Sequence, residues 1–427
     1  MHRCCSPHLR SFGRSALRQR SPRFRAAPDT WTAGDVLQFS AMIQPIRPLR
    51  VTHVISNLLG GGAETLVRGL CVGLRAEGID ASIVSVYNSD LDAAQKAKLG
   101  VPVVEVARKG RGDLTFIPRL MQAMRELAPD VVHAHLHSGK YAGRIAALAA
   151  GVPAIVFTEH GDEAGGLVRR TVNRLLHPRT TRFIVFTQSE RERYARVEGI
   201  PIERIAVIPN GIAHVPPAGT ADRAAQRAAL GIPQDAFVFV VPARLCDQKN
   251  QALAIGALAR GVSAGLPWYL LLAGTGPDEA QLRASVSAAQ LDSRVRFLGF
   301  RSDLPDLYRA VDLYLMSSRW ERMPLALGEA MMAGLPVITT PWQGARDFVT
   351  DGDTGVVLED WSVEAAYGKM RAAFDDPARL AALAERGRRH ALSAFDITRS
   401  VQRHADLYRS LAPVPAVIGN RALHPNG

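Results

Sequence analysis

Residues 317–341, "SSRWERMPLALGEAMMAGLPVITTP", carry the signals of a loop, a short helix and a buried strand in that order. Pro324 suits the first turn of a helix, where its missing N–H is not needed. Gly334 suits the C-terminal stop, because glycine tolerates the backbone conformation that ends many helices. The β-branched run at residues 337–340 predicts a buried strand. The stretch therefore predicts one helix–strand unit of an α/β protein.

The same alternation extends on both sides of this unit, with a Pro/Gly-rich break at residues 213–222 that reads as a linker. The strand-like runs before the break are "VTHVIS", "ASIVSVY", "VVHAH", "AIVFTEH", "RFIVFT" and "IAVIP". Those after it are "AFVFVVPARL", "WYLLLAGTG", "VRFLGF", "LYLMSS", "PVITTP" and "GVVLE". Such alternation predicts parallel strands with helices on both faces. We expect two doubly wound sheets, with a ligand in the crevice at the carboxyl ends of the strands.

Composition and charge narrow the function classes. The chain has 427 residues, of which 47% are hydrophobic and 22% charged, and this size suits two or three globular domains. Residues 1–41 hold seven arginines against Asp29 and Asp35, so they supply +5 of the formal charge of +12. They contain no apolar core of a secretory signal. We interpret them as a disordered tail or an over-long gene start with Met42 as the true beginning; an organelle-targeting segment is a weaker alternative.

The remaining charge of about +7 is spread over helices, without the clustering and aromatic interleaving of a nucleic-acid binder. This distribution of charge fits an acidic membrane surface or a phosphorylated substrate better.

The cysteines and apolar runs bear on where the protein works. Cys4 and Cys5 lie in the basic tail, and Cys71 and Cys246 belong to no motif, so a reducing compartment is expected. No apolar run approaches the roughly 18 to 20 residues that span a bilayer. We therefore expect a cytoplasmic protein.

The glycine-rich loops fit a nicotinamide cofactor poorly, and the histidines fit a zinc ion poorly. The loops "GGGAET" (60–65) and "GTGPDE" (274–279) do not complete the GxGxxG fingerprint, which disfavours a nicotinamide cofactor. Their glycines either bring the backbone close to an anion at a helix N-terminus or make tight strand-to-helix turns. "HAHLH" (133–137) places three histidines on one face of an extended strand, but no nearby acidic residue completes a zinc site. We expect strand-end polar residues facing the crevice rather than a metal.

Charged residues at two strand ends suggest an anion site. Arg244 and Lys249 in "ARLCDQKN" lie just beyond the buried run "AFVFVV". Taken alone they could be two solvated surface charges. Glu321 lies in the loop before the helix of residues 324–334 and Glu329 lies on it. That helix N-terminus is an electropositive seat for phosphate. One carboxylate could accept hydrogen bonds from a sugar and the other could bind a ribose, although either could be a solvated carboxylate.

Glu321 and Glu329 also form the E-x7-E pattern of retaining glycosyltransferases with the GT-B fold, and the chain resembles glycosyltransferase family 4 over roughly residues 50–410. Further stretches occur in the order of that family: "GGAE", "FTEHG", "IPNGI", "ARLCDQKN", "AGTGP", "FLGF" and "EAMMAGLPVITTP". The resemblance implies two Rossmann-like domains facing an interdomain cleft, and transfer of a sugar from a nucleoside-diphosphate donor. The Arg244–Lys249 pair then becomes a diphosphate site rather than two surface charges.

The resemblance also implies roles for individual residues. Glu321 would contact the transferred sugar, His160 would lie near its reacting face, and Arg244 and Lys249 would stabilise the leaving diphosphate. The remaining implied donor contacts are Glu329 to the ribose, Gly61 and Gly62 through backbone N–H groups, Phe300 and Arg301 around the base, and Pro324 and Leu325 at the helix start. Phe300 could equally be a core aromatic. Two fixed cations could replace a metal, so no metal or other cofactor is expected.

The sequence departs from the family pattern at two places that border the expected sugar pocket. Arg322 occupies the place where the family usually has glycine, and "GARD" (344–347) replaces a Gly-Gly-x-x-Glu element. Paired carboxylates could instead indicate a glycosidase, but such an enzyme would not need the pair of cations. A catalytically inactive sugar-nucleotide-binding protein is a third interpretation.

We expect a disordered tail or over-long start at 1–47, two Rossmann-like domains at 48–213 and 214–394, a helix at 395–412 that packs back on the first domain, and a flexible tail at 413–427. The resemblance implies that the first domain lies on the acceptor side and the second on the donor side. Related bacterial enzymes suggest a glycan or lipid-linked acceptor in cell-envelope or exopolysaccharide biosynthesis. Peripheral contact with an anionic membrane would then involve residues 167–182, "LVRRTVNRLLHPRTTR", although these could also form an ordinary solvated helix face. No nucleic-acid partner is expected.

Overall fold

The computed structural model describes residues 47–59, 61–110, 112–113, 115–161, 167–217 and 223–412, with the side chains of 167–170 outside the description. The predictions about the two tails and about a start at Met42 concern residues outside these ranges.

The first sheet has seven parallel strands in the order β3-β2-β1-β4-β5-β6-β7. Its strands are β1 (Arg50–Ile55), β2 (Asp80–Ser85), β3 (Val103–Glu105), β4 (Val131–His135), β5 (Ala154–Thr158), β6 (Arg182–Val185) and β7 (Ile205–Val207). The second sheet has six strands in the order β10-β9-β8-β11-β12-β13, which are parallel too. These are β8 (Phe237–Pro242), β9 (Trp268–Ala273), β10 (Val295–Gly299), β11 (Leu313–Met316), β12 (Val337–Thr339) and β13 (Val356–Val357).

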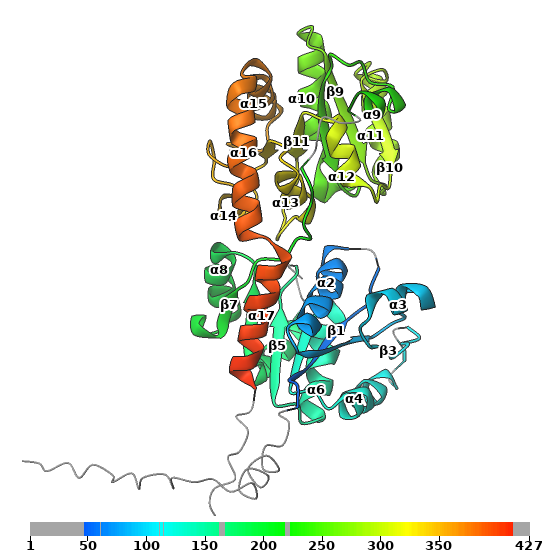
Figure 1. Cartoon of the computed structure of the whole chain (residues 1–427), viewed down its shortest axis with the longest axis vertical. Coiled ribbons are helices and arrows are strands. Elements are labelled where there is room, and N and C mark those ends of the chain that lie inside the picture. The colour runs from blue at the N-terminus through cyan, green and yellow to red at the C-terminus, as the bar shows by residue number, and fades with distance from the viewer. Residues whose placement is uncertain are drawn as a thin grey trace, which may run out of the picture. The chain divides into compact units, whose positions relative to one another are not determined.

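Helices cover both faces of each sheet, because the central strands are buried on both sides (Figure 1). Those of the first sheet are α2 (Gly62–Ala76), α3 (Ala93–Leu99), α4 (Phe116–Leu127), α5 (Leu136–Ser138), α6 (Arg144–Ala149), α7 (Leu167–Leu176) and α8 (Gln188–Glu198). Those near the second sheet are α9 (Arg223–Ala229), α10 (Gln251–Ser263), α11 (Glu279–Ala288), α12 (Leu304–Leu307), α13 (Leu325–Met332), α14 (Ala345–Phe348), α15 (Val363–Asp375) and α16 (Pro377–Ala394). The predicted α/β class with two doubly wound sheets is confirmed.

The last helix that the structure describes, α17 (Ile397–Leu411), packs against α2 of the first sheet. Val401, Ala405 and Tyr408 of α17 are buried in the same hydrophobic core as β1 and α2. The chain therefore passes between the sheets twice. The two passages are hydrogen-bonded to each other, since the Ile212 N–H donates to the Phe395 carbonyl at 2.7 Å and the Ile397 N–H donates to the Ile212 carbonyl at 3.0 Å.

Each sheet has one point at which the strand order reverses, between β1 and β4 in the first and between β8 and β11 in the second. Ligands of doubly wound sheets bind at such points, beyond the carboxyl ends of the strands. The segments that leave these four strands are the glycine loop, the "HAHLH" segment, the "ARLCDQKN" loop and the loop of Glu321. The topology thus brings together four of the segments that the sequence singled out.

Candidate functional site

The loop from residue 317 to 324 leads from β11 to α13. Pro324 has φ −74° and ψ 106°, so it precedes the helix as its N-cap, one residue before the first helical position. At the other end Gly334 has φ +83°, and its N–H donates to the Met331 carbonyl at 3.0 Å. This left-handed conformation explains the glycine at the predicted stop. Glu321 accordingly lies in the loop before the helix and Glu329 lies on it, as predicted.

Lys249 lies against the start of α13 and pairs with Glu321. Its ammonium group donates to the Glu321 carboxylate, which also accepts a hydrogen bond from Ser318 Oγ at 2.7 Å. The Ser317 hydroxyl donates a hydrogen bond to the Lys249 carbonyl at 2.7 Å. A small pocket of about 100 Å³ is lined by Lys249, Glu321 and the first residues of α13, including Pro324 and Leu325. A cation and a helix N-terminus therefore share one cavity.

Arg244 differs from Lys249 in that its guanidinium is exposed. It makes no hydrogen bond or ion pair with any residue that the structure describes, while its backbone carbonyl accepts from Gln251 Nε2 at 2.9 Å. A long cationic side chain on a backbone that is held in this way can turn toward an incoming anion without first breaking an ion pair.

A larger pocket of about 730 Å³ is built from both sheets. Gly62 and His160 come from the first sheet, and Glu321 and Arg322 from the second. A Cβ atom on Gly62 would lie 3.2 Å from Leu325 Cδ1, so the glycine loop meets the start of α13 closely. The other lining residues are Ala63, Glu64, Leu136, Gly161, Phe186, Asn210, Gln248, Trp320, Met323 and Gln343.

His160 follows β5 and lines this pocket. Burial, with a smaller contribution from nearby His404, lowers the pKa of His160 to about 3. The imidazole is therefore neutral at neutral pH. His160 Nε2 lies 3.0 Å from Nδ1 of His135.

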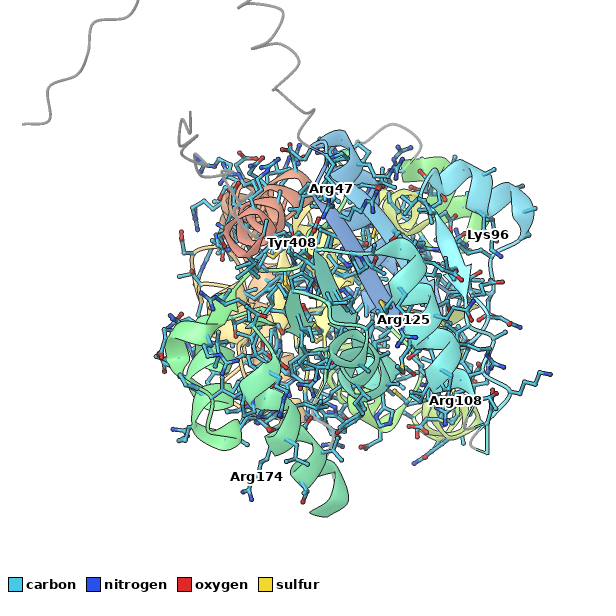
Figure 2. The ribbon with its side chains drawn as sticks, turned by 90° about the horizontal axis from the view of Figure 1, so that it is seen from below. Arg47, Lys96, Arg108, Arg125, Arg174 and Tyr408 are labelled. Carbon is cyan, nitrogen blue, oxygen red and sulfur yellow. The ribbon has the colours of Figure 1, made fainter. Side chains whose placement is uncertain are left out.

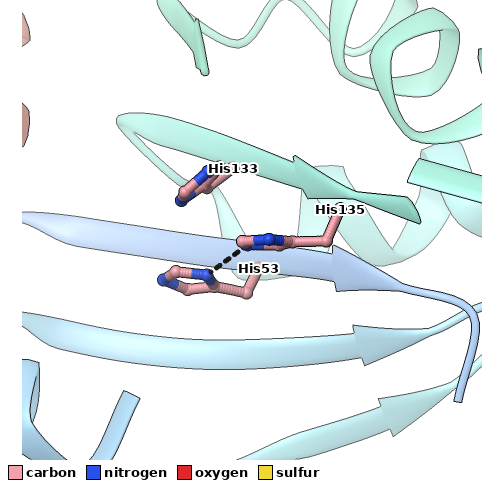
Figure 3. A group of neighbouring side chains, drawn as sticks. All are labelled: His53, His133 and His135. Atoms are coloured by element: carbon pink, nitrogen blue, oxygen red, sulfur yellow. Dashed lines mark hydrogen bonds between the residues drawn. The ribbon is translucent and has the colours of Figure 1, made fainter. Parts of the chain in front are cut away.

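The prediction that the histidines of "HAHLH" share one strand face toward the crevice is wrong. β4 ends at His135 because Leu136 adopts φ +54° and starts α5, so His137 lies on a helix. His133 and His135 are fully buried beside His53 of β1 (Figure 3). Their burial follows from the central position of β4 and from α17, whose Tyr408 hydroxyl lies 2.6 Å from His133 Nδ1.

His53, His133 and His135 have ring nitrogens within 4.8 Å of one another, a spacing that could hold a metal ion. Five of their six nitrogens already take part in hydrogen bonds. The partners outside the trio are Tyr408, Thr158 and His160. A metal would have to displace these bonds in a fully buried site, so the arrangement favours a hydrogen-bonded histidine cluster.

The residues expected around the nucleotide lie in three environments. Glu329 is half-buried on α13, where burial raises the pKa of its carboxyl group, and it lines neither of the two pockets of Glu321. Phe300 is 79% exposed, so the core-aromatic alternative is wrong. Arg301 makes a two-point ion pair with Asp303, with both N–O distances at 2.6 Å. The functional roles of these three residues stay predictions.

The glycines of "GTGPDE" lie close to the backbone of a neighbouring loop. A Cβ atom on Gly274 would lie 2.1 Å from the Ala243 carbonyl oxygen, and one on Gly276 would lie 2.1 Å from that of Leu245. Both glycines therefore let the loop after β9 pack against the loop that carries Arg244.

Two contacts between the halves of the site involve the departures from the family pattern. Arg322 Nη1 donates to Glu190 Oε1 at 2.7 Å, and both side chains are largely buried. Asp347 of the "GARD" segment accepts from the N–H and the hydroxyl of Ser189 at 3.1 and 2.6 Å. Glu190 and Ser189 begin α8. The sequence marked Arg322 and Asp347 as unusual but gave no sign of partners 132 and 158 residues away.

Replacing Arg322 with glycine should lower the free energy of unfolding by about 2 kcal/mol, because Glu190 loses a charged hydrogen-bond partner in a buried place. Urea unfolding measures this change. Arg319→Ala is the matched control, since its ion pair with Asp247 is exposed and should contribute less than about 1 kcal/mol. Equal losses of unfolding free energy in the two variants would show that the Arg322–Glu190 pair stabilises the fold no more than an exposed ion pair does.

Comparison with known proteins agrees with this geometry. The family model described as "Glycosyltransferase Family 4" matches residues 60–214, and that described as "Glycosyl transferases group 1" matches residues 222–390. The chain is 30% identical over 315 residues to EpsF of Bacillus subtilis (strain 168), a protein named as a glycosyltransferase, and the match covers 68% of this chain and 78% of EpsF. It is 28% identical over 309 residues to the UDP-Gal:alpha-D-GlcNAc-diphosphoundecaprenol alpha-1,3-galactosyltransferase of Escherichia coli, covering 69% of this chain and 79% of that protein.

Solved structures share the fold. HepE from Anabaena in complex with UDP-glucose has a TM-score of 0.75 at 23% identity and covers 85% of this chain and 100% of its own. WaaG, a glycosyltransferase involved in lipopolysaccharide biosynthesis, has a TM-score of 0.66 at 19% identity, with coverages of 84% and 99%. The predicted GT-B fold and family are thereby confirmed. The chain is a glycosyltransferase and belongs to glycosyltransferase family 4.

Proposed function

We propose that this glycosyltransferase transfers a hexose from a nucleoside-diphosphate donor, with retention of the anomeric configuration, to a glycan or lipid-linked acceptor. The observation that carries the proposal is the cavity shared by Lys249, Glu321 and the N-terminus of α13. A diphosphate is the anion that suits the Lys249 ammonium, a helix N-terminus and a second, exposed cation at Arg244.

The chemistry follows from these charges. As the nucleoside diphosphate departs, negative charge grows on its phosphate oxygens. Lys249 and the N–H groups at the start of α13 stabilise that charge because they are held in place before the reaction begins. Arg244 adds a second charge by turning toward the diphosphate. Glu321 holds Lys249 in position and can accept hydrogen bonds from the sugar that occupies the larger pocket.

Uridine nucleotides are the first donors to consider, and envelope polysaccharide assembly is the first setting. HepE binds UDP-glucose in its solved complex, and the E. coli relative is named as a UDP-galactose transferase that acts on a diphosphoundecaprenol-linked sugar. A second relative, LpsB of Rhizobium meliloti, is named as a lipopolysaccharide core mannosyltransferase. These names support a hexose donor and an envelope acceptor for this chain.

A panel of nucleotide sugars tests the proposal. UDP-glucose, UDP-galactose, GDP-mannose and ADP-glucose are each incubated with the protein, and slow hydrolysis to free nucleoside diphosphate is scored. We expect one or two donors to be hydrolysed without any acceptor. Cleavage of aryl glycosides in place of nucleotide sugars would identify a glycosidase, and nucleotide binding without turnover, even with acceptors present, would identify an inactive sensor.

We expect turnover without a divalent metal, because Lys249 and Arg244 supply the positive charge that a metal would otherwise bring to the diphosphate. EDTA should therefore leave hydrolysis of the preferred nucleotide sugar unchanged. Loss of activity in EDTA followed by recovery with Mg²⁺ or Mn²⁺ would contradict this prediction.

Peripheral membrane contact through the first domain is a further part of the proposal. No helix in the described part of the chain combines the length and apolarity that a membrane crossing needs. Arg174 on α7 and Arg179 after it are exposed, and Leu175 between them is 62% exposed. Figure 2 shows Arg174 pointing outward from α7, with Arg108 and Arg125 on other elements of the same domain. Arg169 and Arg170 lie outside the described side chains.

Each basic residue near an anionic leaflet contributes about 1 kcal/mol, so several on one face suffice for reversible binding. The protein should sediment with vesicles that contain phosphatidylglycerol at low salt and be released at high salt. Arg174→Glu with Arg179→Glu should abolish sedimentation. Binding that ignores the charge of the lipid would contradict the proposal and leave residues 167–182 as a solvated face.

A further inference from the structure

His160, His135 and His53 form a continuous row of hydrogen-bonded imidazoles that starts at the pocket and ends in the interior. His160 Nε2 lies 3.0 Å from His135 Nδ1, and His135 Nε2 lies 2.9 Å from His53 Nδ1. The last two rings are stacked at an interplanar angle of 15° and are fully buried. The row uses one nitrogen of each end residue and both nitrogens of His135.

The number of protons on the three rings of this row is set by their neutral charge. Burial lowers the pKa values of His53 and His160 to about 3, and burial together with the neighbouring histidines lowers that of His135 well below its usual value. All three rings are therefore neutral at pH 7, and each carries one N–H. Two of the three protons lie in the two hydrogen bonds. The third must lie on one of the two outer nitrogens, His53 Nε2 or His160 Nδ1.

The surroundings of the outer nitrogens decide between these two arrangements. His53 Nε2 is buried and has no hydrogen-bond partner among the described residues. An N–H placed there would be an unsatisfied buried donor, which is rarer in proteins than an unsatisfied acceptor. His160 Nδ1 also has no partner among the described residues, but His160 lines the larger pocket. A proton on His160 Nδ1 can therefore meet solvent or ligand.

We propose that His135 and His53 are positioning residues that hold His160 in the tautomer with its proton on Nδ1, so that His160 is a fixed hydrogen-bond donor to an oxygen of the bound nucleotide sugar. In this arrangement His53 Nδ1–H donates to His135 Nε2, and His135 Nδ1–H donates to His160 Nε2. The identity of the ligand rests on the proposed function, whereas the tautomer does not.

One consequence is that His160 acts as a donor and not as a general base. Its Nε2 lone pair is occupied by the His135 N–H, and its Nδ1 carries the proton, so no free lone pair faces the pocket. The site therefore favours an oxygen lone pair of the ligand at this position, such as that of a sugar hydroxyl or a phosphate.

Nitrogen-15 NMR of histidine-labelled protein measures the tautomer directly. The His160 signals are assigned by their loss in His160→Gln. In the wild-type protein without ligand, we expect the protonated, pyrrole-type shift on Nδ1 and the pyridine-type shift on Nε2. The reverse assignment overturns the proposal. This measurement needs no nucleotide, so it stands even if the donor panel shows no turnover and the proposed function fails.

Substitutions at His135 separate positioning from packing. His135→Asn keeps an amide N–H near the place of Nδ1 and should preserve the tautomer, whereas His135→Leu should let His160 exchange between tautomers and lower kcat/KM for the preferred nucleotide sugar about tenfold. Tyr408→Phe is the matched control, because it removes a buried hydrogen bond from His133 but none from the row. Equal losses in the three variants would overturn the proposal. If His135→Leu does not fold, the nitrogen-15 measurement of the His160 tautomer in the wild-type protein still tests the proposal.

Discussion

Replacing Lys249 with alanine should lower kcat/KM for the preferred nucleotide sugar by about a hundredfold to a thousandfold, the range expected for one preorganised charge at a leaving group. Affinity for the nucleoside diphosphate alone should fall by about 1.5–3 kcal/mol, as for one charge-assisted hydrogen bond. A second effect acts in the same direction. Without the Lys249 ammonium, the largely buried Glu321 carboxylate faces the diphosphate with no neutralising partner from Lys249.

Lys369→Ala is the matched control, since this lysine belongs to the same domain and makes an exposed ion pair with Glu359 at 2.7 Å. Titration calorimetry with the diphosphate and steady-state kinetics measure the two effects, and the melting temperature reports folding. Arg244→Ala should also weaken binding, with no change in melting temperature because its side chain has no partner among the described residues. Unchanged diphosphate affinity in both Lys249→Ala and Arg244→Ala would show that the diphosphate binds elsewhere.

Acidification should unfold the protein at a pH well above the usual range of carboxylate titration. Burial lowers the pKa values of His53 and His160 to about 3 and those of His177 and His404 to about 4, and burial with neighbouring histidines lowers those of His133 and His135 well below their usual value. In the unfolded chain the same groups titrate near pH 6.5. The unfolded state therefore binds protons that the folded state cannot accept, so stability is fully present above about pH 7 and is lost as the pH falls toward 4.

Each such histidine removes slightly less than the limiting slope of about 1.4 kcal/mol per pH unit, so the six together remove roughly 7 kcal/mol between about pH 6 and pH 5. That is comparable with the whole free energy of unfolding of many domains, which is about 5–15 kcal/mol. Urea unfolding at a series of pH values measures the slope. His404→Gln should reduce the slope by about a sixth, since it removes one of the six groups. The variant should still fold, because a glutamine amide can donate to the Ser400 carbonyl that His404 Nδ1 contacts at 2.7 Å. A stability that is flat from about pH 7 to pH 5 would contradict the prediction.

The sequence predicted the elements that have strong local signals. The twelve strand-like runs all contain strands, because each run is long enough and apolar enough to be recognised alone. Strand β3 was missed because it has three residues, none of them buried, at the edge of its sheet. The helix α13 was predicted to within one residue at its start and two at its end, since Pro324 and Gly334 mark its ends by backbone preferences that do not depend on the rest of the fold.

Site residues were predicted where a single segment of sequence identifies them. The contacts of the site were missed where they join two segments that are far apart in the sequence. Glu321 and Lys249 were each found from their own strand ends. The burial of His133 could not be foreseen, because the residue that covers it, Tyr408, is 275 positions away. In the same way Arg322 was read as a departure from a pattern, while the reason for an arginine there is Glu190 on the other half of the site.

The return of α17 to the first sheet has a consequence for the order of events during synthesis. Val401, Ala405 and Tyr408 belong to the core around β1, yet they are made only after every strand of the second sheet has left the ribosome. The first sheet must therefore wait, with the part of its apolar core that α17 covers left exposed beside α2, while the second sheet is translated and free to fold. A nascent chain that stops before residue 397 should expose that face to chaperones and proteases, and release from this state should coincide with emergence of the final helix.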